Sequence, residues 1–218
     1  MDQFATARSE MIDRQLQSRG ISDERVLAAM ARVPRHLFVP KAEQPRAYWD
    51  GPLSIGHDQT ISQPYVVALT CELLEIGENA KVLEVGAGSG YAAAVLADLA
   101  QKVITLERLP ELVQLARDNL LKAGCSNVEV MCTDGTLGCP VEAPFDAIAV
   151  AAGAPAVPDS LKKQLKVGGR LVVPVGRSRR LQDLIRVLRT SETEFQVENL
   201  GAVAYVPLVG AEGWSDGD

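Results

Sequence analysis

The sequence predicts an α/β fold: a mainly parallel, doubly wound sheet of about seven strands with flanking helices and an N-terminal helical segment. Three observations lead to this prediction. From residue 65 onward, short apolar runs alternate with longer helical segments, as they do in β-α-β units. A glycine-rich turn at residues 86–90 joins the first strand to the next helix. The 218 residues are enough for one domain of this kind to bury a core.

Two helices and a long loop precede the sheet in the sequence. Apolar residues at helical spacing predict a helix over residues 3–18, which ends at Gly20. Ser22 is expected to cap a second helix, which stops at Pro34. Residues 40–64 are rich in proline and glycine and predict a loop. The loop is expected to be ordered and packed because it contains large apolar side chains: Tyr48, Trp49, Leu53 and Ile55.

The core elements follow in chain order. A helix is expected from Tyr65, and residues 91–100 form an alanine-rich helical run. Pro110 suits the first turn of a third helix, which stops at Gly124. The expected strands are residues 81–85, 102–106, 128–132, 147–150, 170–175, 184–188 and 202–208.

The pattern shows no internal repeat and no linker, so we expect a single domain over residues 1–218. Within it, residues 1–64 form the N-terminal helices and loop, residues 65–180 the α/β core, and residues 181–218 the closing strands and tail. The tail from Gly210 is acidic and weakly patterned. Two alternatives remain open for it: it covers the site, or it is disordered.

Composition excludes several classes of function. The net charge of −6 opposes binding to nucleic-acid phosphates. The one basic cluster, Arg177, Arg179 and Arg180, is interpreted as a solvated loop. No apolar stretch approaches the length of a membrane span, and no signal-peptide pattern opens the chain, so we expect a cytoplasmic protein that binds no membrane.

The cysteines and histidines do not have the spacing of a metal site. The chain has four cysteines without a Cys-x-x-Cys pair and only two histidines, so no metal is expected. We interpret the cysteines as buried, reduced thiols, in line with a cytoplasmic location: Cys71, Cys125, Cys132 and Cys139.

The glycine turn predicts a nucleotide-like ligand. It places backbone N–H groups and a helix N-terminus at the carboxyl end of the first strand. Gly86 and Gly88 match the start of a dinucleotide fingerprint, but Gly90 comes one position early and Tyr91 stands where the third glycine should be. No lysine of the P-loop type follows. Neither a dinucleotide nor a phosphate cradle is therefore favoured.

Acidic residues surround this turn. Glu107 ends the second strand 21 residues after Gly86, which is the separation expected of a carboxylate that accepts two ribose hydroxyls. Asp134 and Gly135 follow the third strand, where the Asp134 side chain could meet an adenine amino group, and Glu84 precedes the turn. Acids repel a pyrophosphate but suit a sulfonium and an amine. The set resembles the S-adenosylmethionine site of class I methyltransferases, which have a Rossmann-like fold.

The loop before the turn gives a more specific resemblance. Together with segments along nearly the whole chain, it is similar to the protein-L-isoaspartate O-methyltransferases, which repair isomerised aspartyl residues. The segments that carry the resemblance are residues 33–39 (VPRHLFV), 55–64 (IGHDQTISQP), 144–148 (PFDAI), 164–165 (QL), 168–176 (GGRLVVPVG) and 206–208 (VPL).

The resemblance implies methyl transfer from S-adenosylmethionine, which becomes S-adenosylhomocysteine, to the free α-carboxylate of L-isoaspartyl residues in proteins and peptides, with D-aspartyl residues a further candidate. The methyl ester then loses methanol through a succinimide. A carboxylate with a pKa of about 3.5 is already ionised, so positioning matters more than a general base. The resemblance marks Ser62 as catalytic, and we expect it to orient the acceptor by hydrogen bonding; capping the helix near Pro64 is its structural alternative. A monomer is expected.

The resemblance implies two sets of binding residues. The cofactor set is Gln59, Thr60, Ile61, Glu84, Gly86, Gly88, Gly90, Glu107, Asp134 and Gly135. The substrate set is Ile55, Thr60, Ser62 and Val206.

Two residues depart from the family pattern. Asp58 replaces a common glycine, and aspartate is among the better-tolerated replacements if the backbone there is left-handed. We expect its side chain to point to solvent, because a carboxylate near the substrate carboxylate would repel it. Gly153 interrupts an Ala-Ala-Ala-Pro run and is expected to loosen the loop on the substrate side. His57 is interpreted as a bystander.

Two other functions remain open at this point. One is a class I methyltransferase for another small carboxylic acid or a biosynthetic peptide. The other is a binding module that keeps the fold without turnover. The complete set of acids and glycines, together with Ser62, weighs against the second.

Overall fold

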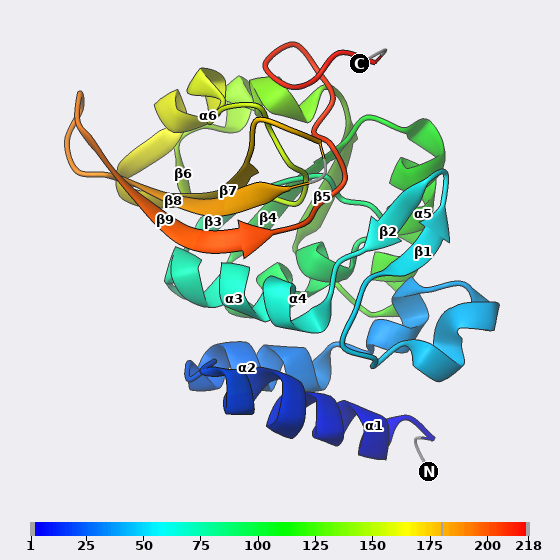
Figure 1. The fold of residues 1–218 in the computed structure, drawn as a ribbon. Coiled ribbons are helices and arrows are strands. Elements are labelled where there is room, and N and C mark those ends of the chain that lie inside the picture. Colours follow the sequence, from blue (N-terminus) through cyan, green and yellow to red (C-terminus); the bar gives the residue numbers. More distant parts are fainter. Residues whose placement is uncertain (1–2, 180, 217–218) are drawn as a thin grey trace.

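A seven-stranded sheet forms the centre of the molecule (Figure 1). The computed structural model describes residues 3–179 and 181–216. The strand order is β5-β4-β3-β6-β7-β8-β9, in which the five strands from β5 to β7 are parallel and the last two antiparallel. The strands are β3 (Lys81–Val85), β4 (Lys102–Glu107), β5 (Val128–Cys132), β6 (Phe145–Val150), β7 (Leu165–Val175), β8 (Gln182–Arg189) and β9 (Phe195–Val203). This confirms the predicted fold class.

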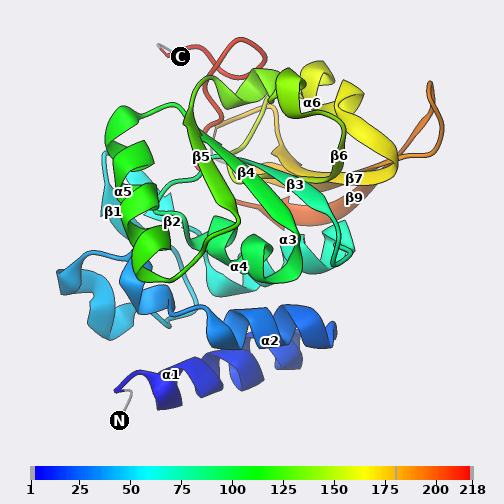
Figure 2. The same ribbon diagram turned by 180° about the vertical axis from the view of Figure 1, so that it is seen from behind.

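Helices cover both faces of the sheet (Figure 2). One face carries α3 (Pro64–Leu74), α4 (Tyr91–Leu99) and α5 (Pro110–Lys122), and the other carries the short α6 (Asp159–Lys163). Alternate residues of each strand enter two different cores: Val82 packs on the α3–α5 side, whereas Leu83 packs on the α6 side. A parallel sheet buried on both faces needs such apolar strands, which is why their runs were visible in the sequence.

The N-terminal helices pack beneath α3 and α4 as a third layer (Figure 1). The predicted first helix consists of α1 (Ala5–Glu10), a π-helical turn η1 (Met11–Leu16) and a 3-10 turn η2 (Gln17–Arg19). The second is α2 (Glu24–Arg32), and the prediction that Ser22 caps it is wrong. Asp23 is the cap, because its carboxylate accepts the N–H groups of Arg25 and Val26, while Ser22 donates to Glu72.

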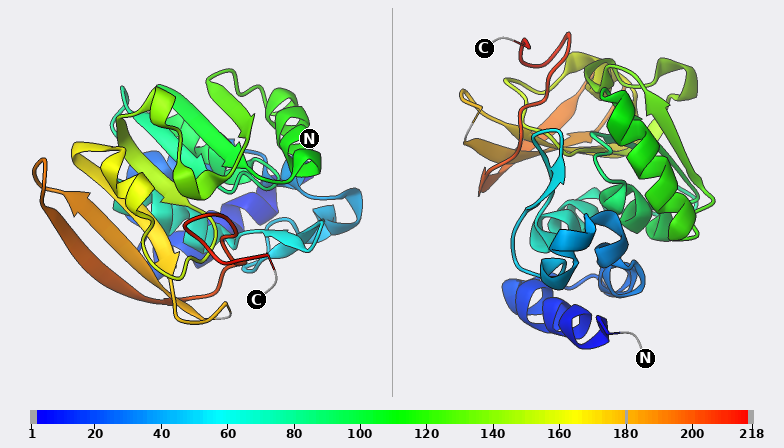
Figure 3. Two further views of the ribbon diagram at one scale, coloured as in Figure 1. Left: turned by 90° about the horizontal axis from the view of Figure 1, so that it is seen from above. Right: turned by 90° about the vertical axis from the view of Figure 1, so that its right-hand side faces the viewer.

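The predicted loop of residues 40–64 contains a β-hairpin, β1 (Leu53–Gly56) paired with β2 (Gln59–Ile61). Two 3-10 turns precede it, η3 (Arg35–Phe38) and η4 (Lys41–Arg46). Tyr48, Leu53 and Ile55 are buried as expected, but Trp49 is 59% exposed, so its predicted packing is wrong. Figure 3 shows this hairpin at the same end of the sheet as the C-terminal tail.

Several boundaries differ from the prediction. The expected strand over residues 202–208 is wrong: β9 ends at Val203, and the next residues cross the end of the sheet. The helix α6 and the 3-10 turns η5 (Gly135–Leu137) and η6 (Pro140–Glu142) were not predicted, because they are too short to show a period. No helix among the described residues is long and apolar enough to cross a membrane.

The cysteine and tail predictions are partly corrected. All four thiols are free, and Cys71 and Cys139 are buried, but Cys125 is half-buried and Cys132 is exposed. Of the two alternatives for the tail, its described part is ordered and lies over the carboxyl end of the sheet. Arg180 of the basic cluster lies outside the described residues.

Candidate active site

A cavity of about 240 Å³ opens at the carboxyl ends of the central strands. We call it the glycine-turn cavity. The chain runs outward from β3 to β5 and then returns to the other side of β3 with β6, so the cavity lies where the strand order reverses. Residues after β3, β4 and β6 line it, together with the hairpin strand β2 and residues 206–209. Ligands of doubly wound sheets bind at this point.

The three glycines of the turn have different surroundings. All have a positive φ, which L side chains rarely adopt. Gly86 and Gly88 line the cavity, and a Cβ on Gly88 would be 3.3 Å from the Cδ1 atom of Ile55. Gly90 is the N-cap residue of α4, and a Cβ there would be 3.2 Å from the Cγ atom of Leu120 on α5. Gly90 therefore allows α4 and α5 to approach, and its predicted contact with the cofactor stays a prediction.

Glu107 is held rigidly at the end of β4. Its Oε1 atom accepts the backbone N–H groups of Arg108 and Leu109 at 2.8 and 3.1 Å, and its Oε2 atom accepts that of Gly88 at 3.0 Å. The carboxylate lines the cavity. It is therefore preorganised to accept hydroxyl groups, as its place in the sequence predicted.

Glu84 is buried in the floor of the cavity. Its Oε2 atom accepts the hydroxyl of Thr105 at 2.5 Å, while its Oε1 atom has no hydrogen-bond partner in the structure. Burial raises the pKa of Glu84 to about 8, and the charge of Glu107 adds to this effect. The Oε1 atom is thus placed to accept from a cationic ligand, whose charge would favour the ionised form.

Of the two predicted residues that follow β5, Gly135 lines the glycine-turn cavity and Asp134 does not. Asp134 caps the 3-10 turn η5: its Oδ1 atom accepts from the N–H and hydroxyl of Thr136, and its Oδ2 atom accepts the N–H of Ala211 in the tail. These bonds hold the pKa of Asp134 below its usual value against the opposing effect of burial. Its predicted adenine contact stays a prediction.

The tail and two arginines that contact it add residues to the cavity that sequence reasoning missed. Arg108 and Asp216 both line the cavity and form an ion pair at 3.1 Å. Arg179, which was interpreted as part of a solvated loop, also lines the cavity, and its Nη2 atom donates to the carbonyl of Ser215 at 2.5 Å. No local pattern marks these residues, because the tail meets the cavity only in the folded chain.

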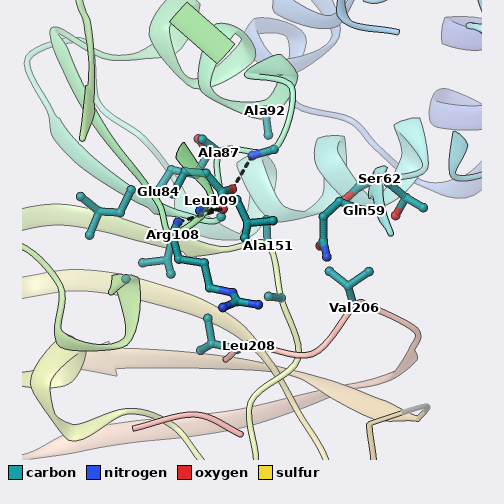
Figure 4. Close-up of a pocket in the computed structure, with 18 of the residues that line it drawn as sticks. Gln59, Ser62, Glu84, Ala87, Ala92, Arg108, Leu109, Ala151, Val206 and Leu208 are labelled. Atoms are coloured by element: carbon teal, nitrogen blue, oxygen red, sulfur yellow. Dashed lines mark hydrogen bonds between the residues drawn. The ribbon is translucent and has the colours of Figure 1, made fainter. Parts of the chain in front are cut away.

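A second cavity of about 560 Å³ adjoins the first, and we call it the side cavity. Thr60, Ser62, Ala151 and Val206 line both. Figure 4 shows Ser62, Gln59 and Val206 together at one end of the glycine-turn cavity, away from Leu109. The two cavities therefore meet at three of the four residues predicted to bind the acceptor: Thr60, Ser62 and Val206.

Ser62 has the geometry of a ligand-binding residue. The cap of α3 is Gln63 and makes no side-chain cap bond, so the alternative that Ser62 caps this helix is wrong. Its hydroxyl has no hydrogen-bond partner among the described residues. Its carbonyl, in contrast, accepts from the Nη2 atom of the buried Arg35 at 2.8 Å, and the Nε atom of Arg35 donates to the carbonyl of Ala47 at 2.7 Å. Arg35 thus fixes the backbone and leaves the hydroxyl available.

The other predicted hairpin residues divide into two groups. Gln59 and Ile61 line the glycine-turn cavity with Thr60. Ile55 is buried against Gly88 and lines neither cavity, so its predicted contact with substrate stays a prediction. His57 and Asp58 form the exposed turn, with φ values of 53° and 54°. The backbone at Asp58 is left-handed, a conformation that aspartate tolerates. The prediction that its side chain points to solvent is confirmed, because the residue is exposed and lines neither cavity.

The prediction that Gly153 loosens its loop is wrong. Its N–H donates to the carbonyl of Val206, and its own carbonyl accepts from the N–H of Leu208 and the indole of Trp214, each at 2.8 Å. Gly153 is thus a fixed point between β6 and the tail.

Comparison with known proteins agrees with this geometry. Residues 6–213 match the family model described as protein-L-isoaspartate(D-aspartate) O-methyltransferase. The chain belongs to this family. A protein-L-isoaspartate O-methyltransferase 2 of Marinobacter nauticus is 56% identical over 207 residues, which cover 95% of this chain and 94% of that protein.

Solved structures of similar proteins share the fold. One is a protein-L-isoaspartate O-methyltransferase with a TM-score of 0.85 and 29% identity, covering 94% of this chain and 67% of the other. Another, from Plasmodium falciparum, was solved in complex with S-adenosyl-L-homocysteine; it has a TM-score of 0.79 and 26% identity, covering 93% of this chain and 98% of that one.

The cofactor of the family is S-adenosylmethionine, and the cavity fits it. Among the described residues that line it, three buried polar atoms lack hydrogen-bond partners: the Glu84 Oε1 atom, the Ser89 hydroxyl and the Arg179 Nε atom. Unpartnered polar groups of this kind are costly unless a ligand satisfies them. Glu84 and Ser89 would hold the polar end of the cofactor, and Glu107 its ribose.

Proposed function

We propose that this protein transfers a methyl group to the free α-carboxylate of L-isoaspartyl residues, and of D-aspartyl residues, in damaged proteins and peptides. One observation supports this most directly: the unbonded hydroxyl of Ser62 lies where the two cavities meet. One cavity carries the acids and glycines that suit the cofactor. The other is open to a peptide.

The cofactor, when bound, supplies an electrophilic methyl group on a cationic sulfur. The residues of the chain then have two tasks. Ser62 donates a hydrogen bond to one oxygen of the acceptor carboxylate, and Thr60 and Val206 limit where that carboxylate can lie. The other oxygen forms the new bond to the methyl carbon as the sulfur–carbon bond breaks, so that both opposite charges disappear. No proton moves in this step, and the site accordingly needs no general base.

The charges around Ser62 favour an anionic acceptor. The buried guanidinium of Arg35 donates to the Ser62 carbonyl at 2.8 Å, and its Nη1 atom has no hydrogen-bond partner among the described residues. The Asp58 carboxylate lies in the exposed turn and lines neither cavity. A carboxylate that approaches Ser62 from the side cavity therefore comes closer to the guanidinium of Arg35, whereas the carboxylate of Asp58 is held outside.

The test compares two synthetic peptides of the same sequence, one with isoaspartate and one with aspartate. Labelled S-adenosylmethionine is supplied, and base-labile methyl ester is counted. Labelling confined to the isoaspartyl peptide is expected. Equal labelling of both peptides would instead favour a methyltransferase for other carboxylates, and binding of the cofactor without labelling would favour a binding module; either result overturns the proposal.

The role of Ser62 is tested by Ser62→Ala. Loss of the hydroxyl is expected to lower kcat at least about tenfold, because a hydrogen bond to a charged group is lost, while the affinity for S-adenosylhomocysteine stays within about twofold. Ser54→Ala, on the exposed face of the same hairpin, is the matched control and should behave as wild type. A Ser62→Ala variant with full kcat would contradict the role.

We also propose that the enzyme acts as a monomer in the cytoplasm and binds neither nucleic acid nor membrane. The net charge of −6 and the free thiols support this. Light scattering of the purified protein checks the monomer, and fractionation of the source cells checks the location.

A further inference from the structure

Gly153 packs closely against the side chain of Gln182, next to the residues that line the acceptor site. It is buried, and its φ does not lie in the range that favours glycine. The backbone alone would therefore accept alanine. A Cβ at this position would, however, lie 2.7 Å from the Cδ atom and 2.9 Å from the Cγ atom of Gln182. A Cβ here would therefore displace the side chain of Gln182, which occupies the space.

Gln182 uses this space to make a specific hydrogen bond. It is the first residue of β8 and is 2% exposed. Its Oε1 atom accepts the backbone N–H of Tyr205 at 2.9 Å. The neighbouring residue, Val206, is held from the other side, because its carbonyl accepts the N–H of Gly153 at 2.8 Å. Two consecutive residues are thus fixed by the same pair.

Val206 faces the site. It lines both cavities, and Figure 4 shows it at the same end of the glycine-turn cavity as Ser62. The segment around it belongs to no strand, since β9 ends at Val203. Its position is therefore held by the bond from Tyr205 to Gln182 and by an isolated parallel bridge between Gly153 and Pro207.

We propose that Gln182 is a positioning residue for the acceptor. Its carboxamide, packed on Gly153, holds residues 205 and 206 so that Val206 confines the carboxylate against Ser62. This rests on the proposed function. It also gives a reason for the departure from the Ala-Ala-Ala-Pro pattern: glycine at position 153 makes room for the glutamine.

The first experiment replaces Gln182 with methionine, which keeps the volume but removes the acceptor. The Tyr205 N–H is then buried without a partner. We expect kcat/KM for the isoaspartyl peptide to fall about tenfold, mainly through KM, while the dissociation constant of S-adenosylhomocysteine changes by less than about twofold. Hydrogen exchange at the Tyr205 amide should accelerate, which reports on the bond without any activity measurement.

Gln164→Met is the matched control. Gln164 is also a buried glutamine beside a glycine, and its Oε1 atom accepts the N–H of Cys139 at 2.8 Å. It lines neither cavity. We expect the Gln164→Met variant to lose thermal stability, while its kcat/KM stays within about twofold of the wild-type value. If both variants lose kcat/KM in proportion to stability, the role of Gln182 is structural only and the proposal fails.

The second experiment tests the pair by a double-mutant cycle. Gly153→Ala alone should lower kcat/KM about tenfold by displacing the carboxamide, and Gln182→Ala should do the same by removing it. In the double variant, the Gln182→Ala substitution leaves room for the methyl group at position 153. Gly153→Ala should then cause no further loss of kcat/KM. A hundredfold, additive loss would overturn the proposal. If the wild-type protein had no activity on the isoaspartyl peptide, the proposed function would be refuted. Hydrogen exchange at the Tyr205 amide would still show whether Gln182 holds this amide.

Discussion

Replacing Glu84 with glutamine should change how the stability of the cofactor-free protein depends on pH. The carboxyl group is fully buried, and burial raises its pKa from 4.5 to about 8. The folded chain therefore keeps this proton between pH 4.5 and 8, whereas the unfolded chain releases it. Stability must then fall as pH rises through this window and level off above pH 8. Glutamine has no proton to lose, so the Glu84→Gln variant should lack this contribution.

The magnitude follows from the pKa. Each pH unit of difference between the folded and unfolded pKa corresponds to about 1.4 kcal/mol. At pH 7 the cost of keeping Glu84 buried is therefore on the order of 3 kcal/mol relative to pH 4.5. The hydroxyl of Thr105 can still donate to the oxygen of a glutamine, so the variant should retain that bond.

Urea unfolding at pH 5.5, 6.5, 7.5 and 8.5 measures this effect. Other titrating groups contribute equally to both proteins, so the difference between wild type and Glu84→Gln isolates Glu84. The exposed Glu129→Gln is the control and should follow wild type. Parallel curves for wild type and Glu84→Gln would show that Glu84 is not protonated in the folded chain and would refute the reasoning.

Cofactor binding gives an independent measurement of the same group. A cationic amine at the Oε1 atom favours the carboxylate, so binding of S-adenosylhomocysteine at pH 7 should release a proton. Calorimetry in two buffers of different ionisation enthalpy counts that proton. Wild type should release up to one proton and Glu84→Gln none; release by neither protein would place the amine elsewhere.

Three further predictions concern the surroundings of the site. Arg35→Lys should lower kcat at least about fivefold with cofactor affinity unchanged, because one ammonium cannot reach the carbonyls of both Ala47 and Ser62; steady-state kinetics with calorimetry checks this. Asp58→Gly should raise the free energy of unfolding by about 1 kcal/mol through relief of its positive φ, with KM for the isoaspartyl peptide unchanged; a lowered KM would place the carboxylate near the substrate. Asp216→Asn should weaken S-adenosylhomocysteine binding less than about fivefold, and the loss should vanish in high salt, because its ion pair with Arg108 is exposed.

The sequence by itself determined the fold class and the chemistry at the glycine turn. Parallel strands buried on both faces must be apolar throughout, and the crossovers must be helical, so both left a periodic signal. Gly86, Gly88 and Glu107 act within a single β-α-β unit, and their spacing alone predicted their geometry. Ser62 could be found only through the resemblance to a family, because a serine before a helix is a common pattern.

Tertiary structure decided what depends on contacts between distant segments. The cap at Asp23 replaced the expected Ser22, since Glu72 on another helix takes the N–H and hydroxyl of Ser22. Asp216 reaches the cavity because the tail folds back over the sheet, where the carbonyl of Ser215 accepts from Arg179 in the connection between β7 and β8. Gly153 appeared to weaken its loop when considered alone. The side chain of Gln182, nearly thirty residues later, fills the space that the missing methyl leaves. A local sequence pattern cannot show such a pairing, because only the sheet brings the two residues together.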